Sequence, residues 1–331
     1  MRQSRQLFLT SAVVAFFGAA TAPMAASQPN APDRPLRVMS YNIKHAQTNA
    51  TCVTPRPEPG NPPNTDCNLD INATIDVIRT YDPDVIGLQE IDRFWARSDY
   101  LDEPAVLGDA LGYPHRCYAP NLDHQPDNHS PVPHQYGTLI LSRYPILECT
   151  NRLLPRVATE EQRGLTLAVI NVRGVPLWFY NTHLHTTQAA RLLQTADIAT
   201  VLDAAPDAPI VLMGDFNARS LDPVVPEMVP IHARLVDTWA VAGVPDAINP
   251  NGFTSPADVD RDPTSRIDYV FVSSDVTATA TFVPITPQAQ DPDITSGTRY
   301  AADHYPVVAD IALPGSAVGV GKPTAPGQTG R

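Results

Sequence analysis

The segment Ile210–Arg219 reads IVLMGDFNAR, and it joins a short apolar run to a cluster of polar residues. Four apolar residues followed by a glycine are typical of a buried strand that ends at a tight turn. Asp215 and Asn217 come directly after this strand. By itself, an Asp-x-Asn sequence is typical of a turn or a helix cap. The segment gains functional meaning only because the same pattern recurs along the chain.

Polar groups also stand at the ends of five other apolar segments. They are Asn42 after LRVMSY, Glu90 after DVIGLQ, His183 after WFYNT, Asp268 at the start of DYVFV, and Asp303 with His304 before YPVV. Taken singly, each is typical of a turn, a solvated strand end or a hydrogen-bonded structural histidine. Open α/β sheets place their sites at strand ends, so the set together predicts one site.

The rest of the chain alternates short apolar runs with helical periodicity, which predicts an α/β fold. Expected helices cover Ile71 to Ile78, ending at Asp82-Pro83, then Pro104–Leu111 and Thr187–Leu202. Expected strands are Leu36–Ile43, Val85–Glu90, Tyr136–Leu141, Leu165–Val172, Val175–Thr182, Ile210–Met213, Ile267–Val272 and Tyr305–Ile311. No internal repeat or central linker interrupts this order.

Composition excludes several classes of protein. Of 331 residues, 43% are hydrophobic and 18% are charged, which is a globular balance and not that of a disordered or fibrous chain. The formal net charge is −12. An acidic protein is not expected to wrap nucleic acid by bulk electrostatics, although a local arginine patch or a bound metal ion can offset the field at one site.

The N-terminus has the layout of a secretory signal peptide. Arg2 and Arg5 precede an uncharged stretch from Leu7 to Ala20, and small residues follow at 25–27. We expect residues 1–27 to be removed and the protein to be secreted; an uncleaved anchor is the alternative. Residues 28–314 are then expected to form one catalytic domain. Residues 315–331, rich in glycine and proline, are expected to form a flexible tail.

If the protein is exported, its four cysteines are expected to form disulfides, because an even number of cysteines in an oxidising compartment is typical of disulfide pairing. Three pairings are possible, and we favour Cys52–Cys67 with Cys117–Cys149. A four-cysteine zinc site is the competing interpretation. The spacing contains no C-x₂₋₄-C pair, which disfavours it.

Seven blocks of the chain resemble, in order, the endonuclease/exonuclease/phosphatase superfamily of metal-dependent phosphoesterases. They are MSYNIKH (39–45), DVIGLQEID (84–92), YGTLILSRYPI (136–146), NTHLH (181–185), GDFNAR (214–219), RIDYVFVS (266–273) and DHYPVVAD (303–310). The resemblance implies a four-layer α/β sandwich, in which two mixed β-sheets pack face to face and are flanked by helices. It also implies hydrolysis of phosphate esters.

The resemblance suggests a metal ion, expected to be Mg²⁺, with Mn²⁺ or Ca²⁺ as alternatives. Magnesium prefers hard oxygen ligands, usually one or two carboxylates with water and substrate phosphate. Glu90 is the expected ligand, with an amide oxygen from Asn42 and support from Asp303. Such an ion neutralises charge that develops on phosphoryl oxygens.

The remaining residues of the set are expected to activate water and bind phosphate. His304 is a candidate general base, with Asp268 fixing its tautomer by resemblance. Asp215 orients the water or shares the base role, and Asn217 donates to the phosphoryl oxygens. His183 contacts phosphate or assists the leaving group, and the division of base and acid among these residues stays open. Outside the set, Arg163 is a candidate for bidentate phosphate binding, with a plain surface arginine as the alternative.

The expected substrate is a phosphodiester, and the expected protein is a monomer without stable membrane insertion. A nuclease is favoured; a phospholipase C or sphingomyelinase-like enzyme is the alternative, and a non-catalytic binding module on the same scaffold is a third. The segment DRFWARSD (92–99) bears on this choice, because arginines flank Phe94 and Trp95. We expect Phe94 in the core and leave Trp95 open to base stacking, lipid contact or core packing.

Overall fold

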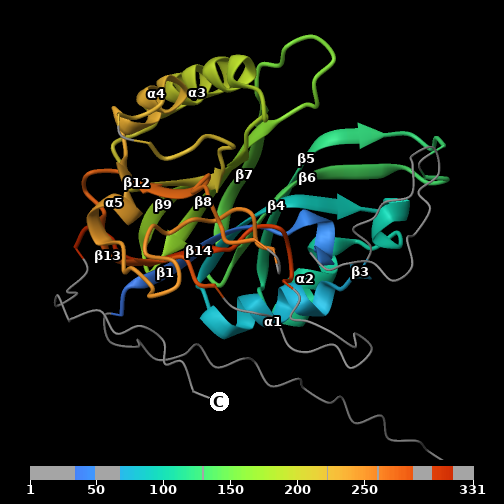
Figure 1. The fold of residues 1–331 in the computed structure, drawn as a ribbon, viewed down its shortest axis with the longest axis horizontal. Helices are drawn as coiled ribbons and strands as arrows, with labels where there is room; N and C mark the ends of the chain where they lie inside the picture. Colours follow the sequence, from blue (N-terminus) through green and yellow to red (C-terminus); the bar gives the residue numbers. More distant parts are fainter. Residues whose placement is uncertain are drawn as a thin grey trace, which may run out of the picture. The chain divides into compact units, whose positions relative to one another are not determined.

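Two six-stranded sheets pack face to face at the centre of the molecule (Figure 1). The computed structural model describes residues 34–48, 68–128, 130–221, 223–258, 261–285 and 300–315. The first sheet has the order β13 (Thr277–Phe282), β14 (Val307–Ala312), β1 (Leu36–Asn42), β4 (Val85–Arg93), β6 (His134–Ser142) and β5 (His115–His124). The second has the order β11 (Val236–Asp237), β12 (Asp268–Val272), β10 (Ile210–Asp215), β9 (Val175–His183), β8 (Gly164–Val172) and β7 (Ile146–Leu153).

Both sheets are mixed. β1 runs parallel to β4 and antiparallel to β14, while β10 runs parallel to β9 and antiparallel to β12. A small ribbon of β2 (Gln47–Thr48) and β3 (Asn68–Leu69) follows β1. The parallel pairs place the carboxyl ends of β1 and β4 together, and likewise those of β9 and β10.

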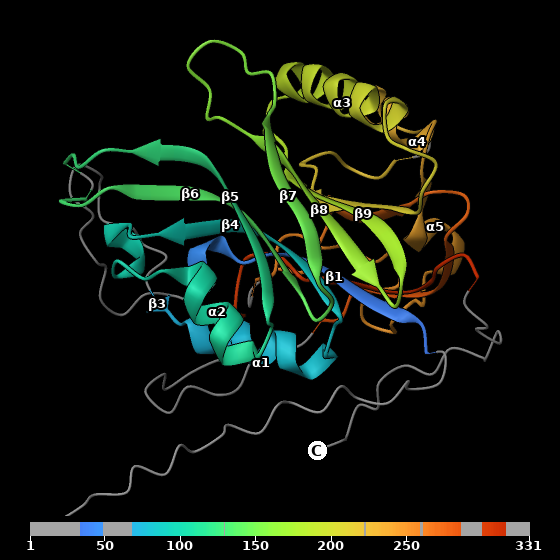
Figure 2. The same ribbon diagram turned by 180° about the vertical axis from the view of Figure 1, so that it is seen from behind.

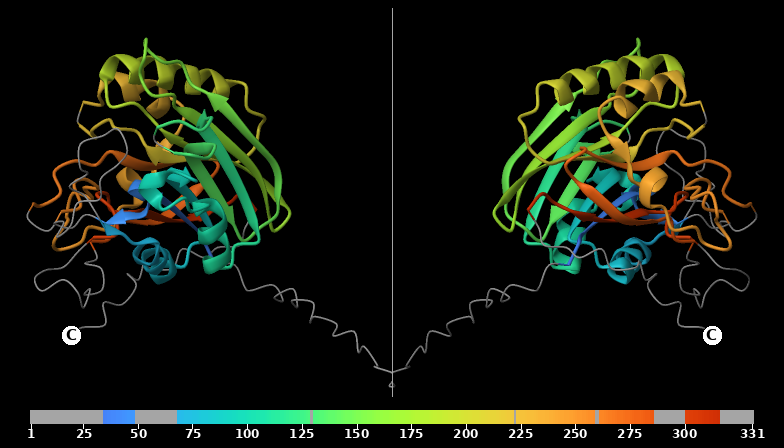
Figure 3. Two further views of the ribbon diagram at one scale, coloured as in Figure 1. Left: turned by 90° about the vertical axis from the view of Figure 1, so that its right-hand side faces the viewer. Right: turned by 90° about the vertical axis from the view of Figure 1, so that its left-hand side faces the viewer.

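Helices cover the outer face of each sheet (Figures 1 and 3). The first sheet is covered by α1 (Ile71–Tyr81) and α2 (Glu103–Leu111), and the second by α3 (Gln188–Asp203) and the short α4 (Val229–His232). Three apolar clusters fill the layers: one between the sheets, one under α1 and α2, and one under α3 and α4. The four-layer sandwich implied by the resemblance is confirmed.

The three expected helices are present, and their ends follow from local chemistry. The carboxylate of Asp70 accepts a hydrogen bond from the backbone N–H of Ala73, which satisfies one free donor at the start of α1. Asp82 then adopts a left-handed conformation before Pro83 and ends the helix. Ile75 and Ile78 point from α1 into the core. The remaining short elements are α5 (Thr238–Ala242) and the 3₁₀ turns Lys44–Ala46, Ala96–Ser98 and Pro226–Met228.

The eight expected strands are confirmed as β1, β4, β6, β8, β9, β10, β12 and β14, but three long strands were not expected. They are β5, β7 and β13, and all three lie at or next to a sheet edge. β7 is largely exposed along its length, and β5 carries Pro120 at a register shift. Neither shows the apolar run that a buried strand displays.

The expected disulfide between Cys117 and Cys149 is present, and it joins the edge strand β5 of one sheet to the edge strand β7 of the other. Cys52 and Cys67 lie outside the described residues, as do the expected signal peptide and nearly all of the expected tail. In the part of the chain that the structure describes, no helix combines the length and apolar composition needed to cross a bilayer.

Candidate active site

Strand register brings three of the expected site residues side by side on the second sheet. Asp215 at the end of β10 lies opposite His183 on β9 and opposite Asp268 on β12. On the first sheet, Asn42 at the end of β1 lies opposite Gln89 on β4, next to Glu90. The strand ends of both sheets therefore open at the same edge of the sandwich.

One amide joins the two halves of the site. The Nδ2 atom of Asn42 donates to Glu90 Oε1 at 3.1 Å and to Asp215 Oδ2 at 3.1 Å, so both of its protons are used. Its Oδ1 atom accepts from the backbone N–H of Lys44 at 3.1 Å. In this arrangement the amide nitrogen faces the carboxylates. The expected role of Asn42 as an oxygen ligand requires its amide to turn and to release Lys44.

A second polar bridge lies beneath the site, within the layer between the sheets. Gln89 Nε2 donates to Asn181 Oδ1 at 2.7 Å, and Asn181 Nδ2 donates to the carbonyl oxygens of Leu88 and Leu139. Both amide side chains are fully buried. Buried polar groups are costly unless paired, so these hydrogen bonds fix how β9 sits on β4 and β6.

Glu90 stands at an irregularity of β4. Its φ of 58° lies in the left-handed region, and the pairing of β4 with β6 shifts register between Leu88 and Ile91. Such strained backbone is common at functional sites, where it aims a side chain that regular pleating would turn elsewhere. Burial raises the pKa of Glu90, but the nearby His45, His183 and Asn42 outweigh burial and hold the pKa well below its usual value. Glu90 is therefore ionised at neutral pH.

His304 and Asp268 form the histidine–acid pair that the resemblance implied. His304 Nδ1 lies 2.8 Å from Asp268 Oδ2, and both side chains are almost completely buried. Because a carboxylate accepts, the Nδ1–H donates to it, and Nε2 faces Asp215 Oδ2 at 3.8 Å. Burial lowers the pKa of His304, but the negative charges of Asp268 and Asp215 have the larger effect. They hold the pKa well above its usual value. Burial and the charge of Asp268 raise the pKa of Asp215 to about 7.

His183 has a tautomer fixed by its neighbour. Arg163 Nη1 lies 2.9 Å from His183 Nδ1. Since a guanidinium has no acceptor, His183 Nδ1 must carry the lone pair and Nε2 the proton, which points at Asp215 Oδ2 at 3.4 Å. Burial and the charge of Arg163 lower the pKa of His183 well below its usual value. Arg163 is itself buried and contacts Glu161 at 3.0 Å, so it is part of the site and not a surface arginine.

Asn217 and Asp303 complete the expected set. The backbone N–H of Asn217 donates to Asp215 Oδ1 at 2.8 Å, and its side chain donates to the carbonyl of Leu184 at 2.9 Å. Asn217 thus holds Asp215 in place as well as lying beside it. Asp303 is the most open member, with 39% of its side chain exposed, and Lys44 Nζ lies 3.9 Å from its carboxylate.

The donor atoms fit a divalent cation. Glu90 is an ionised carboxylate whose Oε2 lies 3.6 Å from Nδ1 of His45, a buried atom without a hydrogen-bond partner within the described chain. Asp215, Asp268 and His304 offer ligand atoms within 4.8 Å of one another, and Asp268 Oδ1 is buried and unpaired there. Carboxylate oxygens of this kind suit Mg²⁺, Mn²⁺ or Ca²⁺.

Sequence reasoning missed Tyr136, which belongs to the same site. Tyr136 is buried on β6, and burial and the charge of Glu90 raise its pKa well above the usual value. The guanidinium of Arg97 lies over its ring, 5.2 Å from the centroid. The block YGTLILS carried the residue, but a tyrosine at the start of an apolar strand has no feature that separates a site residue from a core residue.

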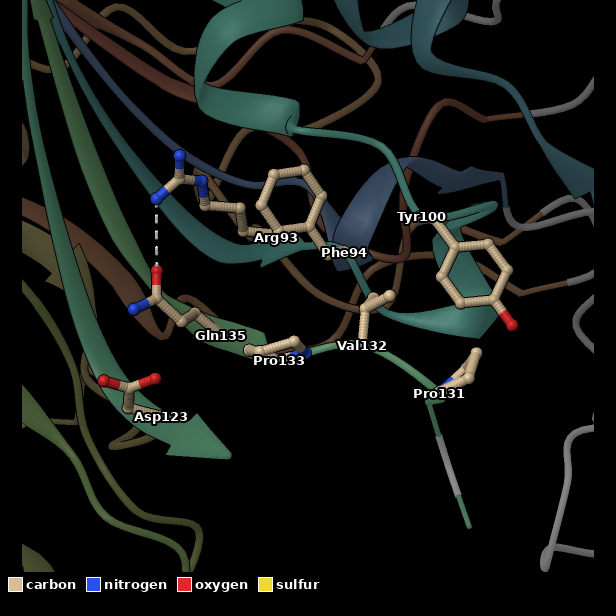
Figure 4. Close-up of a pocket in the computed structure, with 8 residues that line it drawn as sticks. All are labelled: Arg93, Phe94, Tyr100, Asp123, Pro131, Val132, Pro133 and Gln135. Atoms are coloured by element: carbon tan, nitrogen blue, oxygen red, sulfur yellow. Dashed lines mark hydrogen bonds between the residues drawn. The ribbon is translucent and has the colours of Figure 1, made fainter. Parts of the chain in front are cut away.

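A separate apolar pocket lies on the hairpin of β5 and β6, which extends sideways from the sandwich (Figure 2). Its volume is about 590 Å³. Figure 4 shows the side chains that line it. The lining is mostly apolar and consists of Phe94, Tyr100, Pro131, Val132 and Pro133, with Arg93, Asp123 and Gln135. Phe94, expected in the core, lines this surface pocket instead. Side chains alternate along a strand, so Gln135 faces away from Tyr136, and the pocket lies on the opposite face of the hairpin from the site.

Comparison with known proteins agrees with this geometry. The model of the endonuclease/exonuclease/phosphatase family matches residues 39–304. Tyrosyl-DNA phosphodiesterase 2 of Xenopus laevis is 24% identical over 178 residues, or 53% of this chain and 42% of that protein. Protein cwh43 of Schizosaccharomyces pombe is 29% identical over 145 residues, or 43% of this chain and 14% of that protein. The chain thus spans less than half the length of either curated relative.

Solved structures share the fold. An endonuclease/exonuclease/phosphatase from Beutenbergia cavernae gives a TM-score of 0.59 at 23% identity, covering 86% of this chain and 72% of that one. The mannosyl-6-phosphatase Bt3783 of Bacteroides thetaiotaomicron gives 0.60 at 17% identity, covering 84% and 100%. Beta toxin of Staphylococcus aureus gives 0.56 at 16% identity, covering 83% and 99%. With the family model matching most of its length, the chain belongs to the endonuclease/exonuclease/phosphatase family, whose members hydrolyse phosphoester bonds.

Proposed function

We propose that this protein is a divalent-metal-dependent phosphodiester hydrolase that acts outside the cell. The observation that carries the proposal is the single hydrogen-bonded set in which Asn42 links Glu90 to Asp215, beside the His304–Asp268 pair. Export is supported by the uncharged stretch Leu7–Ala20 and by the disulfide between Cys117 and Cys149.

The two halves of the site do different work. Glu90, with support from Asp303, would hold a divalent ion, and that ion would supply charge neutralisation for the phosphoryl oxygens. His304 Nε2 and Asp215 Oδ2, 3.8 Å apart, flank one position, and a water placed there gives its proton to this pair. Asp268 accepts the Nδ1–H of His304 and thereby holds the ring and stabilises its charged form.

His183 and Arg163 bind the phosphoryl group. His183 presents an N–H at Nε2, because Arg163 occupies its Nδ1. A fixed N–H donor in a buried site stabilises developing negative charge without having to reorient. Arg163 is hydrogen-bonded directly to His183, and its positive charge adds attraction for an anionic substrate.

A nucleic-acid phosphodiester is the first candidate substrate. On the same face of the first sheet as Tyr136, Arg97 lies over the rings of both Trp95 and Tyr136, at 4.7 and 5.2 Å. Trp95 and Arg97 are partly exposed, unlike Tyr136, and aromatic and arginine groups of this kind stack on bases. The match to a tyrosyl-DNA phosphodiesterase also supports this choice.

A lipid phosphodiester is the second candidate, favoured by one observation. The apolar pocket of Figure 4 is flanked by exposed apolar side chains, with Tyr100 44% and Val132 40% exposed. Such an apolar surface on a projecting hairpin is suited to contact a lipid layer.

The deciding experiment is a substrate panel with the purified protein. Plasmid DNA, RNA and phospholipid vesicles are each incubated with Mg²⁺, with Mn²⁺ and with excess EDTA, next to the variants Glu90→Gln and His304→Ala. We expect cleavage of a nucleic acid that EDTA abolishes and that falls at least about 10³-fold in both variants. Release of a phosphorylated headgroup with intact nucleic acid shifts the proposal to lipid. Unchanged turnover in both variants on every substrate overturns the site.

A further inference from the structure

A second cluster of metal-ligating side chains lies at the tip of the β5–β6 hairpin, outside the catalytic set. His124 ends β5 and His134 begins β6, directly opposite each other in register, and Asp127 lies in the connecting loop. The two imidazole rings stack with their centroids 5.2 Å apart and an interplanar angle of 20°. One ligand atom from each of the three residues lies within 4.8 Å of the others.

His134 points a lone pair into this cluster. Its side chain is fully buried, and its Nδ1 lies 3.0 Å from the carbonyl oxygen of Val132. A carbonyl only accepts, so the proton resides on Nδ1 and Nε2 is left as an acceptor. Within the described chain this Nε2 has no hydrogen-bond partner, and Asp127 Oδ1, another acceptor, lies 3.7 Å away.

That arrangement is unfavourable without a cation. Leaving a buried acceptor unpaired is destabilising, and a carboxylate facing it adds repulsion. A histidine that binds a metal through one ring nitrogen usually donates its other ring N–H to a carbonyl or carboxylate, as His134 does to the carbonyl of Val132.

The neighbours hold these side chains in position. Trp95 packs its ring edge-on against His134 and His124, with centroid distances of 4.2 and 5.7 Å, and its Nε1 donates to the carbonyl of Gln135. Asp127 accepts from the backbone N–H of Ser130 at 3.1 Å, and Ser130 Oγ donates to the carbonyl of Phe94. The loop is thereby tied to the end of β4.

We propose that His124, Asp127 and His134 bind a transition-metal ion, with Zn²⁺ as the favoured ion. Two imidazole nitrogens and one carboxylate oxygen suit zinc, whereas Mg²⁺ and Ca²⁺ select oxygen ligands. Ligand bonds of about 2.0–2.2 Å place tetrahedral ligands roughly 3.4 Å apart, close to the 3.7 Å between Asp127 and His134. The partly exposed Asp127 leaves one side of the ion open to a water or a further ligand.

The ion holds the two strands of the hairpin together near the candidate active site. His134 and Tyr136 lie on the same face of β6, so this site is two residues along the strand from Tyr136. Arg97, over both Trp95 and Tyr136, links the two sites by direct ring contacts. Zinc bound at the hairpin tip thus holds the ends of β5 and β6 together beyond Gln135, where the pairing of β6 with β4 ends.

The test measures zinc binding and does not depend on activity. EDTA-stripped protein is titrated with Zn²⁺ in competition with a chromophoric chelator, and Co²⁺ is used as a spectroscopic probe. The variants are His124→Gln and Asp127→Asn, both at partly exposed positions, with His134→Asn as a third. His115→Ala, at the other end of β5, is the matched control, and Glu90→Gln identifies zinc bound in the catalytic site.

We expect one equivalent of Zn²⁺ that survives Glu90→Gln and His115→Ala but weakens more than about 100-fold in His124→Gln and Asp127→Asn. A zinc-dependent rise in Tm should disappear in the same two variants. The inference is wrong if the wild type binds zinc only where Glu90→Gln removes it. It is equally wrong if both hairpin variants keep the full stoichiometry and affinity.

Discussion

At the scale of single residues, the site works by fixing where protons sit. Arg163 can only donate, so His183 is held as the Nε2–H tautomer, and Asp268 accepts the Nδ1–H of His304. The two histidines therefore present opposite groups to Asp215: a proton from His183 and, when neutral, a lone pair from His304. The two histidines differ because the Nδ1 atom of His183 accepts from Arg163, whereas the Nδ1–H of His304 donates to Asp268.

Replacing Arg163 by methionine should release the tautomer of His183. Without the guanidinium at Nδ1, both ring nitrogens can carry the proton, and the donor toward Asp215 is lost for part of the population. We expect kcat to fall by about 10²–10³, the usual effect of losing one donor to a developing oxyanion. Nitrogen-15 NMR of the imidazole should show Nε2 protonation in the wild type and mixed protonation in the variant.

Arg152→Met is the matched control, because Arg152 pairs with Asp197 on the exposed side of the same sheet. It should leave both the NMR signature and kcat unchanged. A variant at 163 that keeps the wild-type tautomer would show that something other than the guanidinium sets it.

At the scale of elements, close backbone approach shapes the end of β10. Gly214 has φ of +145°, and a Cβ built there would lie 1.9 Å from the carbonyl oxygen of Thr182 on β9. Only glycine lets β9 and β10 lie close enough for His183 and Asp215 to stand side by side. The glycine in GDFN is thus a packing requirement of the strand that carries the chemistry.

Gly214→Ala should lower the free energy of unfolding by about 3 kcal/mol or more, since both the φ and the clash oppose a Cβ. Gly174→Ala is the comparison: its φ is +93°, but nothing lies within 4 Å of the added atom, so strain alone should cost about 1 kcal/mol. Urea denaturation of both variants measures the difference. Equal losses would mean that the approach of Thr182 is not limiting.

Some strands of the fold could be predicted from the sequence and others could not. β1, β4 and β10 are buried on both faces, so their sequences are apolar runs that predict strands. β7 lies at an edge with mostly exposed residues, and β5 is interrupted by Pro120, so neither has a periodicity that separates a strand from a loop. Edge strands obtain their structure from the neighbour to which they hydrogen-bond, and that neighbour is distant in sequence.

The same reasoning explains the limits of the site prediction. The residues Asn42, Glu90, His183, Asp215, Asp268 and His304 could be selected because each follows or precedes a recognisable strand. That Asn42 uses both amide protons on two carboxylates, and that Arg163 is buried against His183, depends on side-chain contacts between distant strands. Strand patterns give the position of a residue and leave its hydrogen-bond partners undetermined.

At the scale of the whole molecule, one covalent link ties the two sheets together at their edges. Cys117 and Cys149 close a loop with a sequence separation of 32, so chain entropy predicts a stabilisation of about 3–4 kcal/mol. The double variant Cys117→Ala/Cys149→Ala should lose about this much in urea denaturation and remain folded. A loss within about 0.5 kcal/mol of zero would mean that non-covalent packing alone holds these edges.

Global stability should also depend on pH through Glu103. Glu103 is fully buried at the start of α2 and accepts from the backbone N–H of Asp92 at 2.8 Å. Burial and the charge of Asp92 raise its pKa well above the usual value. Its contribution to stability is fully present below the unfolded pKa and is lost as the pH rises through the folded pKa.

Between these two pKa values, each pH unit should remove up to about 1.4 kcal/mol from the free energy of unfolding. Glu103→Gln keeps the acceptor for Asp92 without a titrating group, so its stability should not show this decline. Denaturation of both proteins at a series of pH values gives the comparison. Parallel curves for the two proteins would assign the decline to another group.

The order of strands has a consequence for how the protein is made. β14, the last strand, inserts beside β1, the first, and His304 lies immediately before it. A growing chain that has reached β12 already holds Glu90, His183, Asp215 and Asp268 but lacks His304, whose imidazole contacts Asp268 and lies near Asp215. On the proposed function, we expect a polypeptide that ends before residue 304 to be inactive, and activity to appear only when synthesis is nearly finished and β14 has paired with β1.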